Sequence, residues 1–476
     1  MNSTEYRSRD AIDLARMLHN KELTPLELMD IAIERAESVN VKINALCNVN
    51  FEHGREIARS ASLKGRFGAL PFLLKDSGLG YPPLSNSLGS RLFAGLKIDF
   101  NSTLTERFLD DGMLPFGRTT VPEFSMAPTT EAVQNGGPTR NPWDQSRSPG
   151  GSSGGAAAAV ASGIIPLAHG SDGGGSIRIP ASCCGIYGLK PSRGLIPAGP
   201  ARGEGWGGLA TDGVLSRSVR DTAAALDGVA GMELGAPYAA PKKSGAYTFV
   251  LNRPFEKPKR IAMWSIGFDD IPIDPECHLA LQTAKGLLEK MGHEVVDAPL
   301  PPIQFAKFVE AQINVMAANV TVAVNGKVRN DLASGWEQKL EPAILDAYQR
   351  GRALNAETYA LAITRFHTIG RQLEVYIRDY DFILTPTLMQ PPVGLGFITT
   401  NCDFASFRTK ISRYATFLAI INASGQPAAS IPLHWSKDGL PIGVQMVAPF
   451  GGEADLLRMS ARLEEAQPWF NRTPEI

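Results

Sequence analysis

A segment rich in glycine, serine and proline, residues 138–200, constrains the fold of this chain more than any other part. Within it, residues 148–171 contain no Lys, Arg, Asp or Glu. The continuous apolar part is only about a dozen residues long, whereas a membrane-spanning helix needs roughly 20. The alanine-rich residues 156–161 therefore predict a helix that is buried on all sides between glycine-rich loops. Long stretches without regular structure inside a compact domain are usually functional, so we expect this segment to carry a site.

Strand-like and helix-like patterns alternate on both sides of this segment, which is typical of an α/β layered core. A capping box with proline at the first helical position, Thr24-Pro25-Leu26-Glu27, begins one helix. Ser102 is expected to cap another, which Gly112 ends. Further helices are predicted at residues 51–61, 279–291 and 454–463 and over most of 300–375, and strands at residues 70–74, 113–116, 261–265, 381–386, 428–432 and 443–447. Because no repeat or clear linker divides the sequence, we expect one α/β domain over residues 1–476.

The composition excludes several classes of protein. The chain has 47 Lys+Arg and 48 Asp+Glu residues, so it lacks the basic surface of a nucleic-acid-binding protein. Its five cysteines are an odd number spread thinly over the chain, which favours free thiols in a reducing compartment over a disulfide framework. The N-terminal residues lack the apolar region of a signal peptide. We therefore expect a cytoplasmic protein whose partners are neither nucleic acid nor a membrane.

Three consecutive glycines stand directly before a serine in the run Gly173-Gly174-Gly175-Ser176. Glycine allows backbone conformations that point successive N–H groups inward with little steric cover. An oxyanion hole needs such donors beside its nucleophile, so Ser176 is a candidate nucleophile. The bland alternative is a tight glycine turn that ends in an ordinary serine.

A second glycine-rich run, residues 149–155, matches the Gly-x-Ser-x-Gly nucleophile elbow at Gly150, Ser152 and Gly154. The elbow needs a strand before it, but residues 141–147 are typical of turns. We therefore interpret the match as accidental. The simpler alternative is that Ser152 or Ser153 caps the alanine-rich helix.

Lys75 ends the apolar run of residues 71–74. A lysine in this position more often reaches solvent from the end of a strand. If it is instead buried beside hydroxyl groups, desolvation lowers its pKa, and it could act as a neutral base. Motifs for a metal site or a phosphate-binding loop are absent from the sequence, which indicates no cofactor and no metal.

Taken together, these clusters resemble the amidase signature family. The resemblance covers nearly the whole chain. Its main motifs are Leu74-Lys75-Asp76, Ser148-Pro149-Gly150-Gly151-Ser152-Ser153-Gly154-Gly155, Ser171-Asp172-Gly173-Gly174-Gly175-Ser176-Ile177-Arg178 and Gly443-Val444-Gln445. It implies the amidase signature fold, an α/β fold with a central mixed, twisted β-sheet covered by helices on both faces. It also divides the chain into N-terminal helices (1–65), a catalytic signature core (66–220) and a variable pocket region (300–415).

The resemblance implies a role for each motif. Ser176 would be the nucleophile, Ser152 after a cis peptide would relay protons, and Lys75 would be the base. Four backbone N–H groups would form the oxyanion hole, those of Gly173, Gly174, Gly175 and Ser176. The supporting hydrogen bonds would come from Ser153, Asp172 and Arg178, and the acyl pocket would lie near Ser125, Met126 and Ala127. The family more often has threonine or isoleucine at 173, so we expect the extra glycine to loosen the loop or to admit a bulkier acyl group.

The implied function is hydrolysis of a small, fairly hydrophobic amide, such as an anilide, carbamate, hydrazide or cyclic amide. The Ser-Asp-Gly-Gly-Gly-Ser form resembles the branch that holds 6-aminohexanoate cyclic-dimer hydrolases and aryl acylamidases. One alternative is the glutaminase subunit of an aminoacyl-tRNA amidotransferase, for which we find no charged clamp in the sequence. A second alternative, a non-catalytic binding protein on the same fold, is disfavoured by the intact Lys75, Ser152 and Ser176. A homodimer is one option for the assembly.

Overall fold

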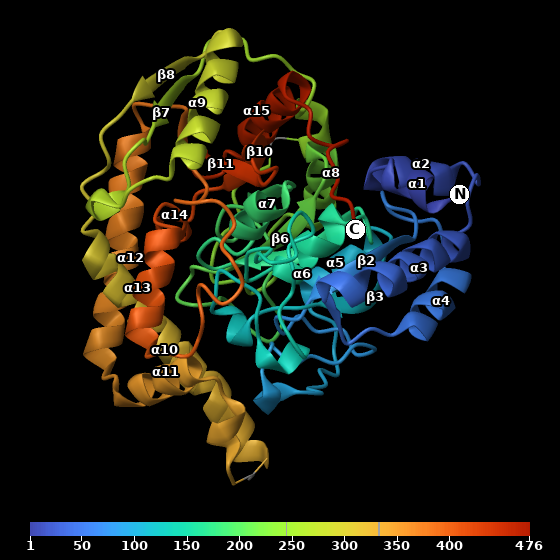
Figure 1. Ribbon diagram of the computed structural model, residues 1–476, viewed down its shortest axis with the longest axis horizontal. Coiled ribbons are helices and arrows are strands. Elements are labelled where there is room, and N and C mark those ends of the chain that lie inside the picture. Colours follow the sequence, from blue (N-terminus) through green and yellow to red (C-terminus); the bar gives the residue numbers. More distant parts are fainter. Residues whose placement is uncertain (244, 332–333) are drawn as a thin grey trace.

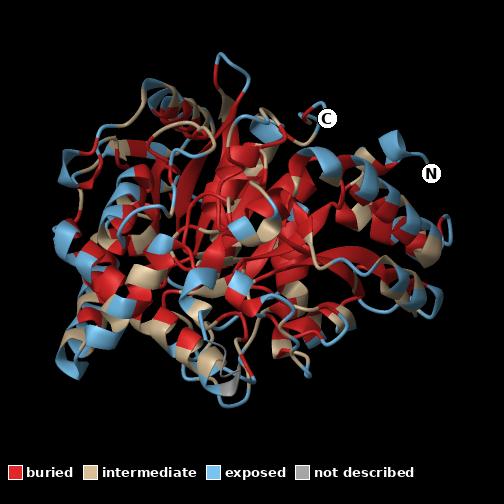
Figure 2. Ribbon diagram, turned by 60° about the horizontal axis from the view of Figure 1, so that its bottom comes forward, coloured by how far each residue is buried: buried red, intermediate tan, exposed pale blue. Residues whose placement is uncertain are grey.

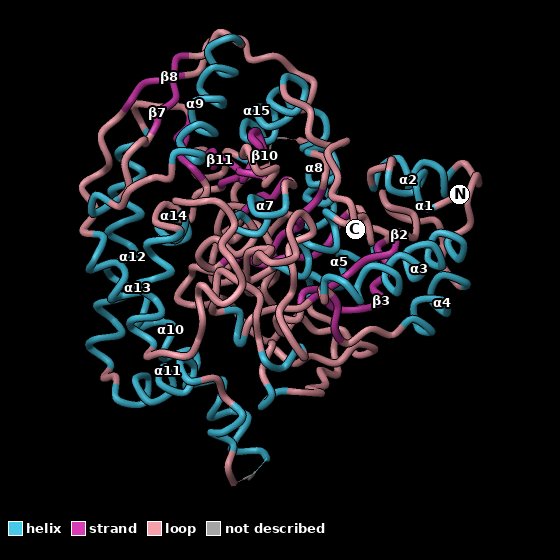
Figure 3. Tube along the Cα trace, in the orientation of Figure 1, coloured by secondary structure: helices cyan, strands magenta, loops and turns pink. Residues whose placement is uncertain are grey.

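Two β-sheets form the centre of the molecule (Figure 3). The computed structural model describes residues 1–476 except 244, 332 and 333. The large sheet has the strand order β4 (Leu167–Asp172), β6 (Thr211–Ser216), β5 (Tyr187–Lys190), β10 (Ala428–Trp435), β11 (Pro441–Val447), β9 (Phe382–Pro386), β7 (Arg260–Met263), β8 (Glu294–Asp297). The small sheet has the order β1 (Leu46–Cys47), β3 (Met113–Thr119), β2 (Leu70–Lys75).

The large sheet is mixed, as predicted. Its strands are antiparallel from β4 to β9, and β9, β7 and β8 are parallel to one another. The sequence did not predict the small sheet. Residues 70–74 and 113–116 each predict a strand, but they do not indicate which strand it pairs with. In the structure β2 and β3 pair in parallel, with a register shift between Phe72 and Leu73, and β1 joins β3 antiparallel.

Helices cover both faces of the large sheet, which two neighbouring residues of β5 demonstrate. Tyr187 donates a hydrogen bond to Ser460 of α15 (Glu453–Ala466). A Cβ on the next residue, Gly188, would lie 2.6 Å from Ala181 of α7 (Arg178–Cys184). Successive residues of a strand point to opposite faces, so α7 and α15 lie on opposite sides. The other helices of this part are α6 (Gly154–Ala161), α8 (Val219–Val229) and α9 (Pro275–Lys290).

The N-terminal helices gather beside the small sheet (Figure 1). They are α1 (Ser3–Arg7), α2 (Ala11–His19), α3 (Pro25–Ile43) and α4 (Phe51–Arg59), with α5 (Thr103–Asp110) between β2 and β3. The predicted capping box of Thr24 and Glu27 is present at the start of α3. The predicted cap at Ser102 is wrong in one respect. Ser102 precedes α5, but its hydroxyl accepts from the Gly80 N–H at 2.7 Å and makes no bond within the helix.

Helix α6 is buried along its whole length, as the uncharged alanine run predicted. Its first turn needs glycine for space, since a Cβ on Gly155 would lie 2.5 Å from the backbone oxygen of Ala45. The alternative that Ser152 or Ser153 caps this helix is wrong. Ser153 occupies the N-cap position without a capping hydrogen bond, and its hydroxyl donates to the Ser171 carbonyl at 3.2 Å.

A separate helical region packs against the large sheet around its own apolar core. It consists of α10 (Phe305–Asp331), α11 (Pro342–Ala353), α12 (Ala356–Ile377), α13 (Phe404–Tyr414) and α14 (Leu418–Ser424). Figure 2 shows buried residues concentrated in the middle of the molecule and exposed residues on its outer helices. None of the helices within the described residues is long and apolar enough to cross a bilayer.

Candidate active site

Three segments bring the predicted catalytic side chains together. Lys75 ends β2, Ser152 lies in the loop before α6, and Ser176 lies in the turn between β4 and α7. The two sheets are joined here, because the backbone N–H of Lys75 donates to Nδ1 of His169 on β4 at 3.1 Å. The two serine loops are joined by a hydrogen bond from the Ser153 N–H to the Ser176 carbonyl at 3.2 Å.

Lys75 is fully buried, so the interpretation that it reaches solvent is wrong. Its Nζ lies 2.7 Å from Ser152 Oγ, 2.8 Å from Ser171 Oγ and 3.3 Å from the Ser171 carbonyl. Burial lowers the pKa of Lys75 to about 7, although the carboxylates of Asp212 and Asp172 act in the opposite direction. A substantial share of this amine is therefore neutral near pH 7, as a base requires. The contact with Ser171 was missed, although that residue lies within the predicted motif.

Ser152 follows a cis Gly151-Ser152 peptide bond, as the resemblance implied. Gly151 leaves no room for a side chain, since a Cβ there would lie 2.6 Å from the Thr129 carbonyl oxygen. Ser152 is buried and contacts Lys75, and it lines the same cavity as the partly exposed Ser176. Within the described residues no hydrogen bond joins the two serine hydroxyls. Hydrogen bonds between catalytic groups often tighten only when the substrate binds.

Asp172 holds the loop that carries Ser176. Its carboxylate accepts from the N–H groups of Gly175 at 2.7 Å and Ile177 at 3.1 Å. The predicted oxyanion donors therefore differ in availability, because the Gly175 N–H already points at Asp172. The remaining donors of the predicted set belong to Gly173, Gly174 and Ser176.

Arg178 pairs with Asp172 in the fully buried layer below this loop. Its Nε and Nη2 each lie 2.9 Å from a carboxylate oxygen. Burial alone would raise the pKa of Asp172, but the charge and hydrogen bonds of Arg178 lower it well below its usual range. The guanidinium also donates to Asn422 and Gln445, at 2.6 Å each. Gln445 lies in a motif of the resemblance, whereas Asn422 had no signal in the sequence.

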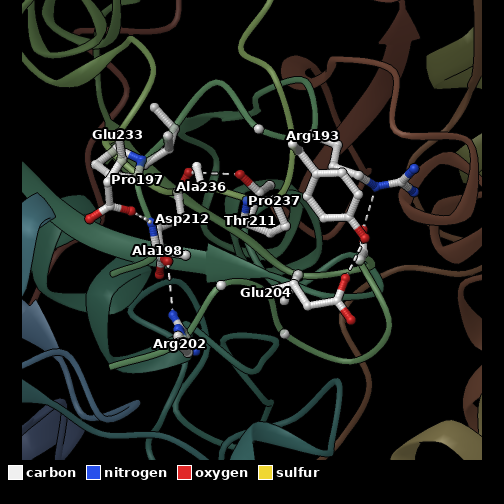
Figure 4. Close-up of a pocket in the computed structure, with 17 residues that line it drawn as sticks. Arg193, Pro197, Ala198, Arg202, Glu204, Thr211, Asp212, Glu233, Ala236 and Pro237 are labelled. Atoms are coloured by element: carbon white, nitrogen blue, oxygen red, sulfur yellow. Dashed lines mark hydrogen bonds and ion pairs between the residues drawn. The ribbon is translucent and has the colours of Figure 1, made fainter. Parts of the chain in front are cut away.

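Behind Lys75 lies a chain of polar groups that the sequence did not reveal. Since Nδ1 of His169 accepts from the Lys75 N–H, Nε2 carries the proton of the neutral ring and donates to Asp212 at 3.1 Å. Burial lowers the pKa of His169, although Asp212 opposes this, and so favours the neutral ring. Asp212 in turn accepts from Arg202 at 3.1 Å, which Figure 4 shows beside a small adjoining pocket. His169 stands in no recognisable motif.

A cavity of about 350 Å³ opens onto these groups. Its walls are more apolar than polar, and they include Ser77, Leu88, Phe124, Ser125, Met126, Ser152, Ser171, Gly173, Ser176, Arg202, Glu204, Trp206, Asp212, Asn319, Val320, Val322 and Ala323. Two of the residues proposed for the acyl pocket, Ser125 and Met126, therefore face the same space as Ser176. Ala127 is buried next to them but does not line this cavity in the part of the chain that the structure describes.

Helix α10 supplies the four cavity residues from 319 to 323, so the long helical region contributes to the site. Among the described residues, none from 388–415 lines this cavity, but Arg408 of that segment donates a hydrogen bond to the carbonyl of the cavity residue Met126 at 3.1 Å. Outside residues 244, 332 and 333, no three His, Cys, Asp or Glu side chains lie close enough together to hold a metal ion.

Comparison with known proteins identifies clear relatives. The Amidase family model matches residues 27–457. The 6-aminohexanoate-cyclic-dimer hydrolase of Pseudomonas sp. strain NK87 is 33% identical over 98% of this chain and 97% of its own. Among solved structures, 6-aminohexanoate cyclic dimer hydrolase superposes with a TM-score of 0.93 at 32% identity, covering 98% of this chain and 99% of that one. A bacterial aryl acylamidase superposes with a TM-score of 0.88 at 25% identity, covering 97% and 96%.

Proposed function

The chain belongs to the amidase signature family and is a hydrolase of amide C–N bonds, and from that premise we propose that Ser176 is its nucleophile, Ser152 its proton relay and Lys75 its base. The observation that carries this proposal is the contact of 2.7 Å between Lys75 Nζ and Ser152 Oγ. The lysine is buried and the serine lines the same cavity as Ser176. A buried amine beside a hydroxyl is the arrangement that a serine nucleophile without a histidine base requires.

The reaction follows from these positions. Ser176 Oγ attacks the amide carbonyl carbon while its proton passes through Ser152 to neutral Lys75. When the C–N bond breaks, the proton returns through Ser152 to the leaving nitrogen, which departs as an amine and leaves an acyl-serine. Water then attacks the ester, gives its proton to the same relay and releases the carboxylic acid with Ser176 restored.

Backbone donors would stabilise the negative oxygen of both tetrahedral intermediates. We assign this role to the N–H groups of Gly173, Gly174 and Ser176, with Gly175 holding the loop through Asp172. Removing one donor from such a hole typically costs about 10²–10³ in kcat. The buried pair of Asp172 and Arg178 supports this assignment, because it fixes the backbone that presents the donors.

The cavity supports a small and mostly apolar amide as substrate. Ligand cavities usually range from about 300 to 1,000 Å³, and this one lies at the lower end. Leu88, Phe124, Met126 and Val320 supply apolar parts of its wall. An anilide, aryl carbamate or cyclic amide fits this description, and the names of the relatives point to two of these classes, the cyclic amide and the aryl amide.

The glutaminase alternative is not favoured. Glutamine recognition needs a free cation and a free carboxylate for the two charged groups of the amino acid. Of the charged residues that line the cavity, Arg202 and Asp212 bind one another at 3.1 Å, and Glu204 accepts a hydrogen bond from Tyr238. We further propose a cytoplasmic location, which five free cysteines support because disulfides form in oxidising compartments. The homodimer also stays a proposal.

The test is a substrate panel on the purified chain. It contains an acyl 4-nitroanilide, an aryl carbamate, the cyclic dimer of 6-aminohexanoate and glutamine. Ser176→Ala and Lys75→Met are assayed beside the parent, with thermal melting to confirm folding. We expect turnover of at least one of the first three substrates and its loss in both variants. Turnover of glutamine alone, or activity that survives Ser176→Ala, would overturn the proposal.

A further inference from the structure

Gly173 is a glycine because of a neighbouring side chain and not because of its backbone. Its φ is not among the positive values that favour glycine. A Cβ at 173 would nevertheless lie 2.6 Å from Cε3 and 2.7 Å from Cζ3 of Trp206. Packed atoms do not approach so closely, so any other residue at 173 would displace the indole. The indole ring therefore occupies the space beside Gly173 that we expected to admit a bulkier acyl group.

The loop that carries Trp206 is closed and firmly anchored. The Ala210 N–H donates to the Gly205 carbonyl at 3.1 Å, and Trp206 between them has a φ of 56°. A bulky residue rarely adopts this left-handed conformation, and such outliers gather at functional sites. The carbonyl of Leu209 accepts from the Asn422 amide at 3.0 Å.

Asn422 also fixes the nucleophile loop. The same amide nitrogen lies 2.9 Å from the carbonyl oxygen and 2.9 Å from a carboxylate oxygen of Asp172. One side chain thus anchors both the loop of Trp206 and the residue before Gly173. The position of the indole relative to the proposed oxyanion donors is therefore set by the fold.

Trp206 presents an aromatic surface to the substrate cavity. It lines the cavity together with Ser152 and Ser176, and within the described residues its ring makes no hydrogen bond. It touches Gly173, at the start of the proposed oxyanion run. The leaving nitrogen must lie by Ser152, which returns its proton, so we assign the indole to the acyl side of the scissile bond.

We propose that Trp206 determines acyl specificity by forming a flat wall beside the oxyanion loop. Acyl groups that are planar next to the carbonyl, such as aryl or carbamate groups, can stack on the wall. Acyl groups that are branched at the carbon next to the carbonyl collide with the indole. This inference rests on the proposed role of Ser176, and it narrows the substrate class to aryl-acyl and carbamate-like compounds.

The experiment uses activated esters, so that it does not depend on knowing the amide substrate. Benzoyl and trimethylacetyl esters of 4-nitrophenol share a leaving group and differ in shape at the acyl carbon. Ser176 Oγ attacks the ester carbonyl, the C–O bond breaks and 4-nitrophenolate is released while an acyl-serine forms. The initial burst of nitrophenolate gives the acylation rate, and the mass of the Ser176 peptide confirms the acylated residue.

For the parent protein we expect benzoylation to be at least about tenfold faster than trimethylacetylation. Trp206→Ala should reverse or erase that preference, and Trp206→Phe should be intermediate. Trp336→Ala is the matched control, because Trp336 packs on Tyr348 and does not line the cavity. Its ester preference should equal that of the parent.

A reciprocal pair of changes tests the contact itself. Gly173→Ala should slow acylation by displacing the indole, and the added Trp206→Ala should restore part of the rate, giving non-additive effects. An unchanged ester preference in a folded Trp206→Ala variant would overturn the proposal, as would strict additivity with Gly173→Ala. Acylation that persists in Ser176→Ala would instead show that the proposed nucleophile is wrong, so the two failures are distinguishable.

Discussion

Replacing Arg178 with methionine should destabilise the protein strongly. The guanidinium is fully buried, and two of its nitrogens lie 2.9 Å from the Asp172 carboxylate. Methionine fills a similar volume, so the main loss is the charge and not the packing. Removing one partner of a buried ion pair costs about 3–5 kcal/mol, because the other charge stays buried and unpaired. That is a large part of the roughly 5–15 kcal/mol by which folded domains are stable.

Urea unfolding followed by circular dichroism at pH 7 measures this loss. The midpoint should fall while the slope stays constant, since the surface exposed on unfolding is unchanged. The control is the double variant Arg178→Met with Asp172→Asn. Its neutral amide removes the unpaired charge, so it should recover at least about 2 kcal/mol. A loss below about 1 kcal/mol in the single variant, or simple additivity in the double variant, would refute the reasoning.

Four further predictions concern the base and two glycines in helices. Because Lys75 with a pKa of about 7 must be neutral to accept a proton, kcat/KM should rise with pH through about 7 and level off above it; a profile flat from pH 5 to 9 would contradict this. Asp212→Asn removes a carboxylate that raises the pKa of Lys75, so the rise should move to lower pH, and a move to higher pH would be the wrong sign. Gly155→Ala should lower stability by about 1–3 kcal/mol, because its Cβ meets the Ala45 backbone. Gly286→Ala, in α9 with nothing near its Cβ, should be neutral or stabilising by urea unfolding.

Periodic and capped elements were predictable because their signals are local. The capping box of Thr24 and Glu27 begins α3 as expected, and the uncharged alanine run forms the buried α6. Ser102 shows the limit of such signals. Its hydroxyl binds the Gly80 N–H, which is distant in sequence, and this contact replaces the local cap.

The proposed catalytic residues were found through motifs, whereas their surroundings were not. Lys75 and Ser152 meet as the resemblance implied. The space beside the extra glycine at 173 is occupied by Trp206, which belongs to a separate loop. Likewise, the hydrogen bond between His169 and the Lys75 N–H joins β4 to β2, which belong to different sheets. Contacts between distant segments leave no periodic trace in one sequence, so they needed the structure.

The most direct test of the central claim is to trap the acyl-enzyme. The protein is mixed with whichever anilide or carbamate it turns over, quenched in acid within milliseconds to seconds, digested and analysed by mass spectrometry. We expect the acyl mass on the peptide that contains Ser176, with none in Ser176→Ala and a much slower appearance in Lys75→Met. An adduct on another residue, or full turnover by Ser176→Ala, would contradict the assignment of the nucleophile.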